Sequence, residues 1–191
     1  MQNWEEMEER ELVERAKKGE PEAFGELYRR YVRRIYGYIY IRIGNREDAE
    51  DLTARTFMRA LRNIDGYKDE GFPLSTWLFR IAHNLVANFL RDTSRRKKRR
   101  EVFLGWLKAD GGLAGGPEER TATNEEKEAL LAAIRQLPSD YQQLLTLKLI
   151  EGMSNEEIGR TMGGRSIGAI KSLYFRALAT LREDLERQGF G

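Results

Sequence analysis

The sequence predicts an all-α protein of two helical domains joined by a flexible linker, and three observations support this prediction. Apolar residues recur at spacings of three and four along most of the chain, which is the pattern of amphipathic helices. No segment reads convincingly as a strand. One stretch rich in Gly, Ala and Pro, residues 101–123, interrupts the helical pattern and separates the two domains.

Composition limits the class of protein before any motif is considered. The chain of 191 residues is 40% hydrophobic and 34% charged, so it can bury a core beneath an ionic surface. It has no cysteine, and therefore neither a disulfide nor a thiol nucleophile. Residues 1–25 are acidic, unlike a signal peptide, and no apolar run approaches the roughly 18 residues that cross a bilayer. We therefore expect a soluble, cytoplasmic protein that does not insert into membranes.

The N-terminal domain is expected to hold long helices with recognisable start signals. One apolar stripe begins at Pro21, a residue favoured in the first turn of a helix. Asn45 can cap the next helix, whose first turn is acidic and whose last turns are basic, as the helix dipole prefers. A turn-rich loop ends at Pro73, after which Ser75 can cap a long helix that runs to Arg100.

The C-terminal domain is expected to hold four helices, two of which form a helix-turn-helix. Ser154 and Glu157 have the spacing of a capping box at the start of the first of these two, and glycines end it. The second helix has an apolar side and an outward side. Its apolar side consists of Ile167, Ile170, Tyr174, Ala177, Leu178, Leu181 and Leu185.

The outward side of this second helix is unusual for a helical hairpin. It carries Ser172, Phe175, Arg176 and Ala179, with Lys171 at its boundary. An exposed aromatic ring among cations and small residues suits binding in the DNA major groove. The alternative is an ordinary hairpin with a solvated face, which explains Phe175 poorly.

Basic residues concentrate in two segments of a chain whose net charge is only +2. Residues 80–100 hold eight bases and one acid, and residues 160–182 hold five bases and no acid. Two separate basic patches on a nearly neutral protein indicate two contact sites for a polyanion. Either patch alone can also be a solvated helix face.

The first basic patch continues a row of polar and aromatic side chains on the helix after Pro73. The row consists of Trp77, Arg80, Asn84, Asn88 and Arg91. These groups can stack on unpaired bases, hydrogen-bond them and neutralise phosphates. Tyr67, Lys68 and Phe72 of the preceding loop can wall a base pocket. Trp77 taken alone is better explained as a core residue.

A third surface lies on the helix after Asn45. Asp48, Asp51, Arg55, Arg59 and Arg62 share one face at spacings of three and four. They can form ion pairs within the helix, or they can dock another protein.

Catalysis finds no support in the sequence. His83 is the only histidine, and the chain has no P-loop, no dinucleotide-binding glycine motif and no metal-ligand spacing. We therefore expect no enzyme activity, no cofactor and no metal; His83 is either a packing residue or a contact on the DNA side.

Three motifs in order and spacing resemble a bacterial RNA polymerase sigma factor of the sigma-70 family, extracytoplasmic-function (ECF) type. "EDAEDLTARTFMRAL" is similar to the helix that binds core polymerase, "STWLFRIAHNLVANFLR" to the −10-element helix, and "MSNEEIGRTMGGRSIGAIKSLYFRALATLRE" to the −35 helix-turn-helix. The resemblance implies a sigma-2-like domain at 8–94, a basic segment and flexible linker at 95–123, and a sigma-4-like domain at 124–187.

The resemblance also implies partners and site residues. The partners are core polymerase, at the clamp of its largest subunit and its flap, and promoter DNA, duplex at −35 and melted at −10; it leaves open whether an anti-sigma factor binds. The core-polymerase set is Asp48, Asp51, Leu52, Arg55, Phe57 and Arg59. The −10 set is Tyr67, Phe72, Trp77, Arg80, Asn84, Asn88 and Arg91. The −35 set is Arg165, Ser166, Lys171, Ser172, Phe175 and Arg176.

The chain departs from the family pattern in the turn of the helix-turn-helix. One residue usually separates the glycine from the serine that begins the second helix, whereas Gly164 and Arg165 both lie there. The departure affects the contacts expected of Arg165 and Ser166 more than those of the helix that follows.

Two other classes of protein remain as alternatives. One is a two-domain regulator that binds operators without polymerase, but such a protein has no use for the single-strand row on the helix after Pro73. The other is a helical scaffold without nucleic acid, which the two basic patches disfavour.

Overall fold

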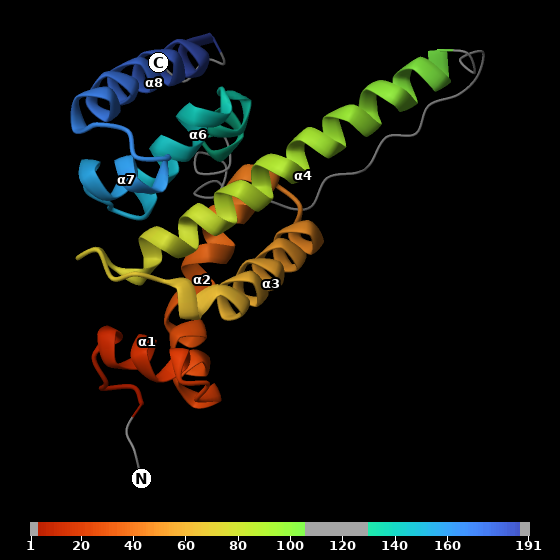
Figure 1. The fold of residues 1–191 in the computed structure, drawn as a ribbon. Coiled ribbons are helices and arrows are strands. Elements are labelled where there is room, and N and C mark those ends of the chain that lie inside the picture. Colours follow the sequence, from red (N-terminus) through yellow and green to blue (C-terminus); the bar gives the residue numbers. More distant parts are fainter. Residues whose placement is uncertain (1–3, 106–129, 188–191) are drawn as a thin grey trace, which may run out of the picture.

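The computed structural model describes the backbone of residues 4–105 and 130–187, and the side chains of residues 4–94 and 130–187. Every regular element within these ranges is helical (Figure 1), which confirms the prediction of an all-α fold.

The N-terminal domain consists of α1 (Glu9–Lys17), α2 (Pro21–Ile43), α3 (Arg46–Asn63), the 3-10 turn η1 (Ile64–Gly66) and the start of α4 (Leu74–Gly105). Two of its helices, α2 and α3, begin at the predicted signals. Pro21 is the first residue of α2, and the side chain of Asn45 accepts a hydrogen bond from the Asp48 amide at 3.0 Å. The largest fully buried side chains of this domain include Leu12, Leu27, Ile35, Tyr38 and Phe79.

The C-terminal domain is a set of shorter helices around a separate group of apolar residues. Residues 130–136 are helical, and α6 (Ser139–Leu145), the π-helical turn η2 (Thr146–Ile150), α7 (Asn155–Thr161) and α8 (Ile167–Arg187) follow. Ser154 and Glu157 form the predicted capping box at the start of α7. Leu144, Leu147, Ile158, Ile170 and Ala177 are buried here.

Helix α4 is longer at both ends than the sequence analysis predicted. It begins at Leu74 rather than after Ser75, because the Pro73 carbonyl already accepts a hydrogen bond from the Thr76 amide at 3.0 Å. It runs to Gly105, past residue 101, where the linker was expected to begin. The rest of the predicted linker, residues 106–123, lies outside the described residues.

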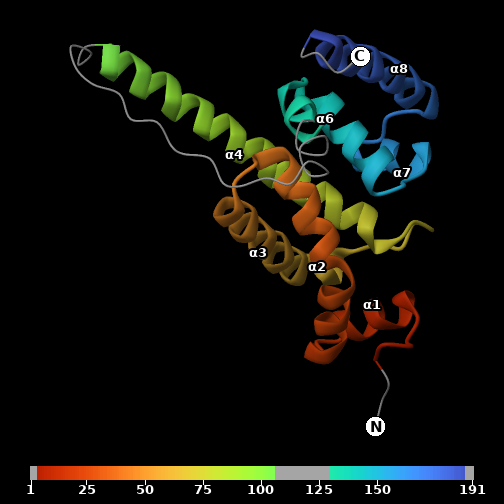
Figure 2. The same ribbon diagram turned by 180° about the vertical axis from the view of Figure 1, so that it is seen from behind.

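Helix α4 lies between the two domains. It contacts α2 and α3 on one side and α7 on the other, while η2 contacts α2. Figures 1 and 2 show α6, α7 and α8 together on the side of α4 that faces away from α3. The start of α4, which carries the predicted −10 residues, is therefore flanked by both domains.

Candidate nucleic-acid interface

The structure brings part of the predicted −10 row into a shallow pocket. Trp77, Arg80 and Asn84 line a pocket of about 270 Å³ together with Arg59 and Asn63 of α3. The Arg80 and Asn84 side chains are exposed, and the Trp77 ring is half-buried. An aromatic face, an amide and a guanidinium thus meet at one place. Arg59, expected in the core-polymerase set, borders this pocket.

Two further members of the row continue along the exposed side of α4. Asn88 and Arg91 are exposed one and two helical turns beyond Asn84. The predicted row is therefore present as a surface about four turns long.

The loop before α4 forms a wall beside Trp77, as expected. The Tyr67 ring lies 5.2 Å from the Trp77 ring between centroids, and the Tyr67 hydroxyl donates to the Phe72 carbonyl at 3.4 Å. Burial, together with a smaller effect of the Asp69 charge, raises the pKa of Tyr67 to about 12, so the phenol stays protonated at neutral pH. Tyr67, Lys68 and Phe72 all border a pocket of about 450 Å³ in front of Trp77.

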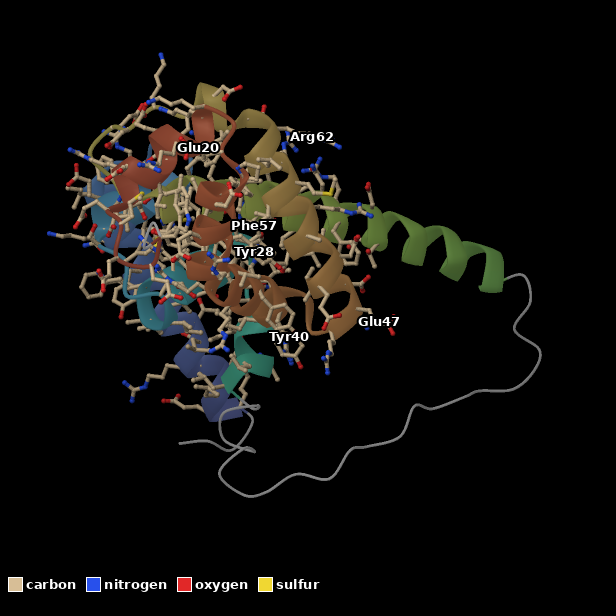
Figure 3. All side chains as sticks on the ribbon, turned by 90° about the horizontal axis from the view of Figure 1, so that it is seen from below. Glu20, Tyr28, Tyr40, Glu47, Phe57 and Arg62 are labelled. Carbon is tan, nitrogen blue, oxygen red and sulfur yellow. The ribbon has the colours of Figure 1, made fainter. Side chains whose placement is uncertain are left out.

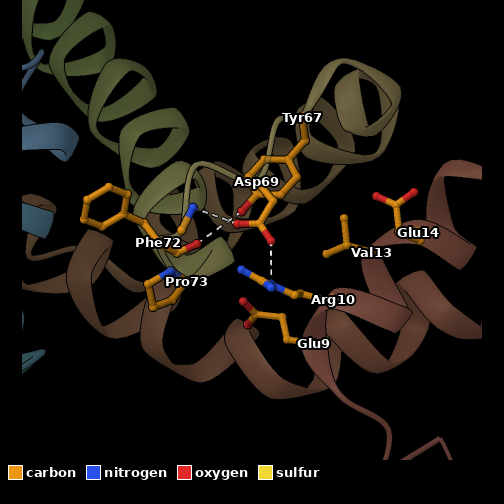
Figure 4. Close-up of a pocket in the computed structure, with 9 residues that line it drawn as sticks. Glu9, Arg10, Val13, Glu14, Tyr67, Asp69, Phe72 and Pro73 are labelled. Carbon is orange, nitrogen blue, oxygen red and sulfur yellow. Dashed lines mark hydrogen bonds and ion pairs between the residues drawn. The ribbon is translucent and has the colours of Figure 1, made fainter.

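A third pocket, on the other side of this loop, was not predicted. It measures about 540 Å³ and lies between the loop and α1 (Figure 4). Its polar walls include Glu9, Glu14 and the ion pair of Arg10 with Asp69 at 2.7 Å. Carboxylates here repel phosphates, so this pocket does not extend the cationic surface. Nothing in the sequence places α1 beside the loop.

The turn between α7 and α8 depends on three glycines. Gly163 and Gly164 have φ of +87° and +84°, a left-handed conformation that other residues seldom adopt. The Gly159 carbonyl accepts hydrogen bonds from the amides of both Gly164 and Arg165, at 2.9 and 3.0 Å. The residue by which this turn exceeds the family pattern is therefore accommodated as a second left-handed glycine.

The same turn determines what two predicted −35 residues do. Ser166 Oγ accepts a hydrogen bond from the Ala169 amide at 3.2 Å, so Ser166 caps α8. Arg165 donates to Asp140 of α6 at 2.6 Å, although both side chains keep contact with solvent.

The remaining predicted −35 residues lie on the exposed face of α8. Phe175 is 72% exposed, and Lys171, Ser172 and Arg176 are exposed beside it. The Arg176 guanidinium bonds to the Ser172 carbonyl of its own helix at 3.3 Å. Ile167 was expected on the apolar side, but it is 46% exposed because α8 only begins there.

Helix α3 exposes the predicted face of acidic and basic side chains, but two residues of the predicted core-polymerase set are buried. Asp51 and Arg55 form an exposed ion pair at 2.8 Å, and Arg59 is exposed. Leu52 and Phe57 are buried, and the Phe57 ring packs against Tyr28 of α2 with ring centroids 4.8 Å apart (Figure 3). They therefore offer no surface to a partner.

Exposed apolar side chains on α3 were missed by the sequence analysis. Met58 and Leu61 are large, apolar and about half exposed. Both are large apolar residues on a helix face that otherwise carries charged side chains, and this contrast is the sequence signal that could have identified them.

His83 is a packing residue rather than part of the exposed row. Its Nδ1 lies 2.9 Å from the Arg42 guanidinium and 3.4 Å from the Tyr38 hydroxyl. Burial, together with a smaller effect of the Arg42 charge, lowers the pKa of His83 to about 4, so the imidazole is neutral at physiological pH.

Two features are absent from the described part of the chain. In residues 4–105 and 130–187 no helix combines the length and apolarity needed to cross a membrane. The same part of the chain holds no group of three or more His, Cys, Asp or Glu side chains placed to bind a metal ion.

Comparison with known protein families matches both domains. The model of Sigma-70 region 2 matches residues 27–96, and that of Sigma-70, region 4 matches residues 127–181. The first match includes α3 and the predicted −10 row, and the second includes the helix-turn-helix.

Individual relatives extend the match over most of the chain. The ECF RNA polymerase sigma factor SigW of Bacillus subtilis is 31% identical, over 94% of this chain and 98% of SigW. The ECF RNA polymerase sigma factor BldN of Streptomyces coelicolor is 42% identical over 90% of this chain, which spans 63% of the length of BldN.

Solved structures share the arrangement of helices. The structure of CnrH in complex with the cytosolic domain of CnrY has a TM-score of 0.69 at 24% identity, and the match covers 94% of this chain and 97% of the CnrH chain. The two proteins therefore share a fold. The sigma factor RpoE in complex with the anti-sigma factor NepR, from Bartonella quintana, has a TM-score of 0.60 at 26% identity, over 85% of this chain and 96% of RpoE. From the SigW match and both region models, this chain belongs to the ECF family of RNA polymerase sigma factors, the proteins that direct RNA polymerase to promoters.

Proposed function

We propose that this chain directs core RNA polymerase to its promoters through two DNA surfaces, one for a melted −10 element and one for a duplex −35 element. The meeting of Trp77, Arg80 and Asn84 at one shallow pocket is the observation that carries the proposal. An aromatic ring, a cation and an amide supply what an unpaired base and its phosphate require: stacking, charge neutralisation and hydrogen bonds.

The −10 surface combines the exposed side of α4 with the loop before it. Its residues are Tyr67, Phe72, Trp77, Arg80, Asn84, Asn88 and Arg91. Arg80 and Arg91 bind phosphates, the two asparagines hydrogen-bond base edges, and the rings stack on bases that leave the duplex. Binding unpaired bases more tightly than paired ones is what allows the protein to help melt the promoter.

The −35 surface is the exposed face of α8. Lys171 and Arg176 contact phosphates or guanine edges, while Ser172 and Phe175 hydrogen-bond or pack at the groove floor. Ser166 acts by capping α8, and Arg165 reaches DNA once it leaves Asp140. Helix α7 crosses the phosphate backbone, as the first helix of such a motif does.

The surface that binds core polymerase lies on α3. Asp48, Asp51, Arg55 and Arg59 supply charges, and Met58 and Leu61 supply an exposed apolar contact. The clamp of the largest subunit is the proposed partner of α3, and the flap is the proposed partner of the C-terminal domain. Leu52 and Phe57 hold α3 against its own domain.

Further assignments follow from the family. An anti-sigma factor is an additional candidate partner, because RpoE was solved in complex with one. The cytoplasm, where polymerase meets DNA, is the proposed location. Sigma factors are not known as enzymes, and we propose that this chain carries out no chemistry of its own.

The variant Asn84→Ala tests the −10 assignment. Holoenzyme with this variant should form open complexes poorly on duplex promoters and nearly normally on templates with a pre-melted bubble, because the lost amide acts on bases as they unpair. The yield of run-off transcript from the two templates measures the difference.

The outcome also separates the competing functions. Equal loss on both templates, or no loss, would leave Asn84 as a structural residue and refute the melting role. A regulator that binds operators without polymerase would instead bind duplex DNA specifically by itself and fail to co-purify with core polymerase.

A further inference from the structure

A single carboxylate of helix α1 holds the start of α4. Glu9 Oε1 accepts a hydrogen bond at 2.8 Å from the amide of Leu74, the first residue of α4. Glu9 Oε2 accepts a second hydrogen bond from the Tyr31 hydroxyl of α2. Burial, together with this bond, raises the pKa of Tyr31, so the phenol remains a donor at neutral pH. Pro73, which precedes α4, has no side-chain acceptor, and Glu9 therefore supplies the cap that the start of α4 lacks.

The next residue of α1 holds the loop before α4 (Figure 4). The Arg10 guanidinium pairs with the Asp69 carboxylate at 2.7 Å. The other oxygen of Asp69 accepts a hydrogen bond from the Gly71 amide at 2.9 Å, in a turn where Gly71 has φ of +80°. Phe72 follows Gly71 directly, so the ion pair stabilises the turn that places the Phe72 ring.

Both contacts act on side chains of the proposed −10 surface. The loop carries Tyr67 and Phe72, and the first turn of α4 carries Trp77. The Lys17 ammonium of α1 lies 5.8 Å from the centre of the Tyr67 ring, which adds a third link between α1 and the loop. Loops are more mobile than the helices they connect, and a loop binds more tightly when it is already held in its binding conformation.

The charges of α1 favour a supporting role over a contact with DNA. Glu9 and Glu14 line the pocket of about 540 Å³ between α1 and the loop, together with Asp69. Three carboxylates in one pocket repel a phosphate. The match to the Sigma-70 region 2 model begins at residue 27, so α1 precedes the matched segment.

We propose that α1 is a positioning element of the −10 surface and controls selectivity for the −10 sequence without touching DNA. Glu9 fixes the start of α4, and Arg10 fixes the loop. Without these contacts the −10 side chains are all present, but only the fraction of molecules with the loop in its binding conformation contributes to affinity. The inference rests on the proposed −10 function of Tyr67, Phe72 and Trp77.

The promoter selectivity of the holoenzyme tests the role of Glu9. The probe is a promoter recovered by the unmodified holoenzyme from duplex templates randomised through the −35 and −10 regions. Transcript yield gives the preference for this promoter over two copies of it, one with a scrambled −10 region and one with a scrambled −35 region. Glu9→Ala should lower the −10 preference by about tenfold, as expected if the loop is in its binding conformation about a tenth of the time. The −35 preference should not change, whereas a general loss of folded protein would lower the yield from every template alike.

Two matched variants separate positioning from a general effect on α1. Glu9→Gln keeps a side-chain oxygen that can accept from the Leu74 amide, and it should retain most of the −10 preference. Glu11→Ala removes a carboxylate of the same helix that pairs with Arg15 of α1 itself, at 3.2 Å, and it should leave both preferences unchanged. An equal loss with Glu11→Ala and Glu9→Ala would overturn the role of Glu9.

Arg10 provides a test that does not depend on stability. Its side chain is 79% exposed, and an exposed ion pair contributes little to folding. Arg10→Glu places a like charge against Asp69 and should lower the −10 preference about threefold at an unchanged melting temperature, while Arg10→Lys keeps the positive charge and should preserve it. Lys18→Glu, at the exposed C-terminal end of α1, makes the same change in net charge and should have no effect.

The outcomes distinguish this inference from the proposed function on which it rests. An unchanged −10 preference in both Glu9→Ala and Arg10→Glu, alongside a loss in Asn84→Ala, would overturn the positioning role and leave the −10 assignment intact. If the unmodified holoenzyme transcribes the scrambled −10 template as well as the selected promoter, the −10 assignment is refuted and the positioning role with it.

Discussion

At the scale of single residues, Gly159 decides whether the helix-turn-helix can form. A Cβ at this position would lie 2.3 Å from the Arg165 carbonyl oxygen, far inside van der Waals contact with backbone that the turn holds in place. The close approach is needed because the Gly159 carbonyl accepts the two amides that end the turn. A glycine inside α7 is therefore a packing requirement rather than a weakness of the helix.

We expect Gly159→Ala to lower the free energy of unfolding by about 1–3 kcal/mol, as overpacking usually does. Urea unfolding followed by circular dichroism measures it. Gly168→Ala is the matched control, because a Cβ in that helical position meets nothing within 4 Å and should be neutral or stabilising by about 0.5–1 kcal/mol. Equal effects of the two substitutions would show that the contact with Arg165 imposes no constraint.

Residue-scale predictions succeeded where the signal was local. Asn45, Ser154 and Glu157 cap their helices as expected, because a cap depends on residues within one turn of it. The burial of Leu52 and Phe57 was not predicted, because it depends on which side of α3 faces α2.

At the scale of elements, α8 divides its surface between the core and the proposed DNA contact. Ile170, Leu173 and Ala177 are buried, while Phe175 and Arg176 project outwards. Periodicity predicted this division except at two positions: Ile167 in the first turn is exposed, and the buried Leu173 was not among the residues assigned to the apolar side. The π-helical turn η2 had no such signal, because the sequence there continues an ordinary helical pattern.

Arg176→Ala should reduce −35-dependent transcription by the holoenzyme. Loss of a base-edge contact should cost roughly 1–3 kcal/mol and relax selectivity at one position, whereas loss of a phosphate contact should weaken binding to all sequences and lower the salt slope by about one unit. Transcription from templates varied through the −35 hexamer, at two salt concentrations, separates the two cases.

Arg187→Ala is the control for this measurement. Arg187 is an exposed arginine at the far end of the same helix, paired with Asp184, and its loss should leave transcription unchanged. If Arg176→Ala and Phe175→Ala both leave the sequence preference and the salt slope unaltered, α8 does not bind the −35 element.

At the scale of the whole molecule, sequence patterns predicted the parts better than their assembly. The two domains and the helix-turn-helix follow from periodicity and caps. The pairing of Arg42 with Ser139, and of Arg34 with Glu151, joins residues about a hundred positions apart along the chain. A local sequence pattern cannot predict contacts between residues so far apart. The position of Arg59 beside Asn84 was not expected for the same reason, because the two residues lie on different helices.

The assembly leaves the proposed polymerase surface uncovered. Asp51 and Arg55 lie on α3, which faces away from α6, α7 and α8 (Figure 1), and both side chains are more than half exposed. The packing of the C-terminal domain against α2 and α4 therefore leaves these two residues of α3 accessible to the polymerase clamp.

Asp51→Arg should weaken association with core polymerase, because it removes one charge of the docking face and places a cation beside Arg55. The fold should persist, since exposed pairs of this kind contribute only about 0.3–0.5 kcal/mol to stability.

Glu186→Arg is the matched control. It reverses the charge in the exposed ion pair of Arg182 with Glu186 on α8, which has the same spacing and the same 2.8 Å length as the pair of Asp51 with Arg55. Co-purification of each variant with core polymerase, with circular dichroism to confirm folding, measures the effect. Because both substitutions change the net charge equally, loss with Asp51→Arg alone would locate the docking site on α3. Undiminished binding by a folded Asp51→Arg protein would remove α3 from the polymerase contact.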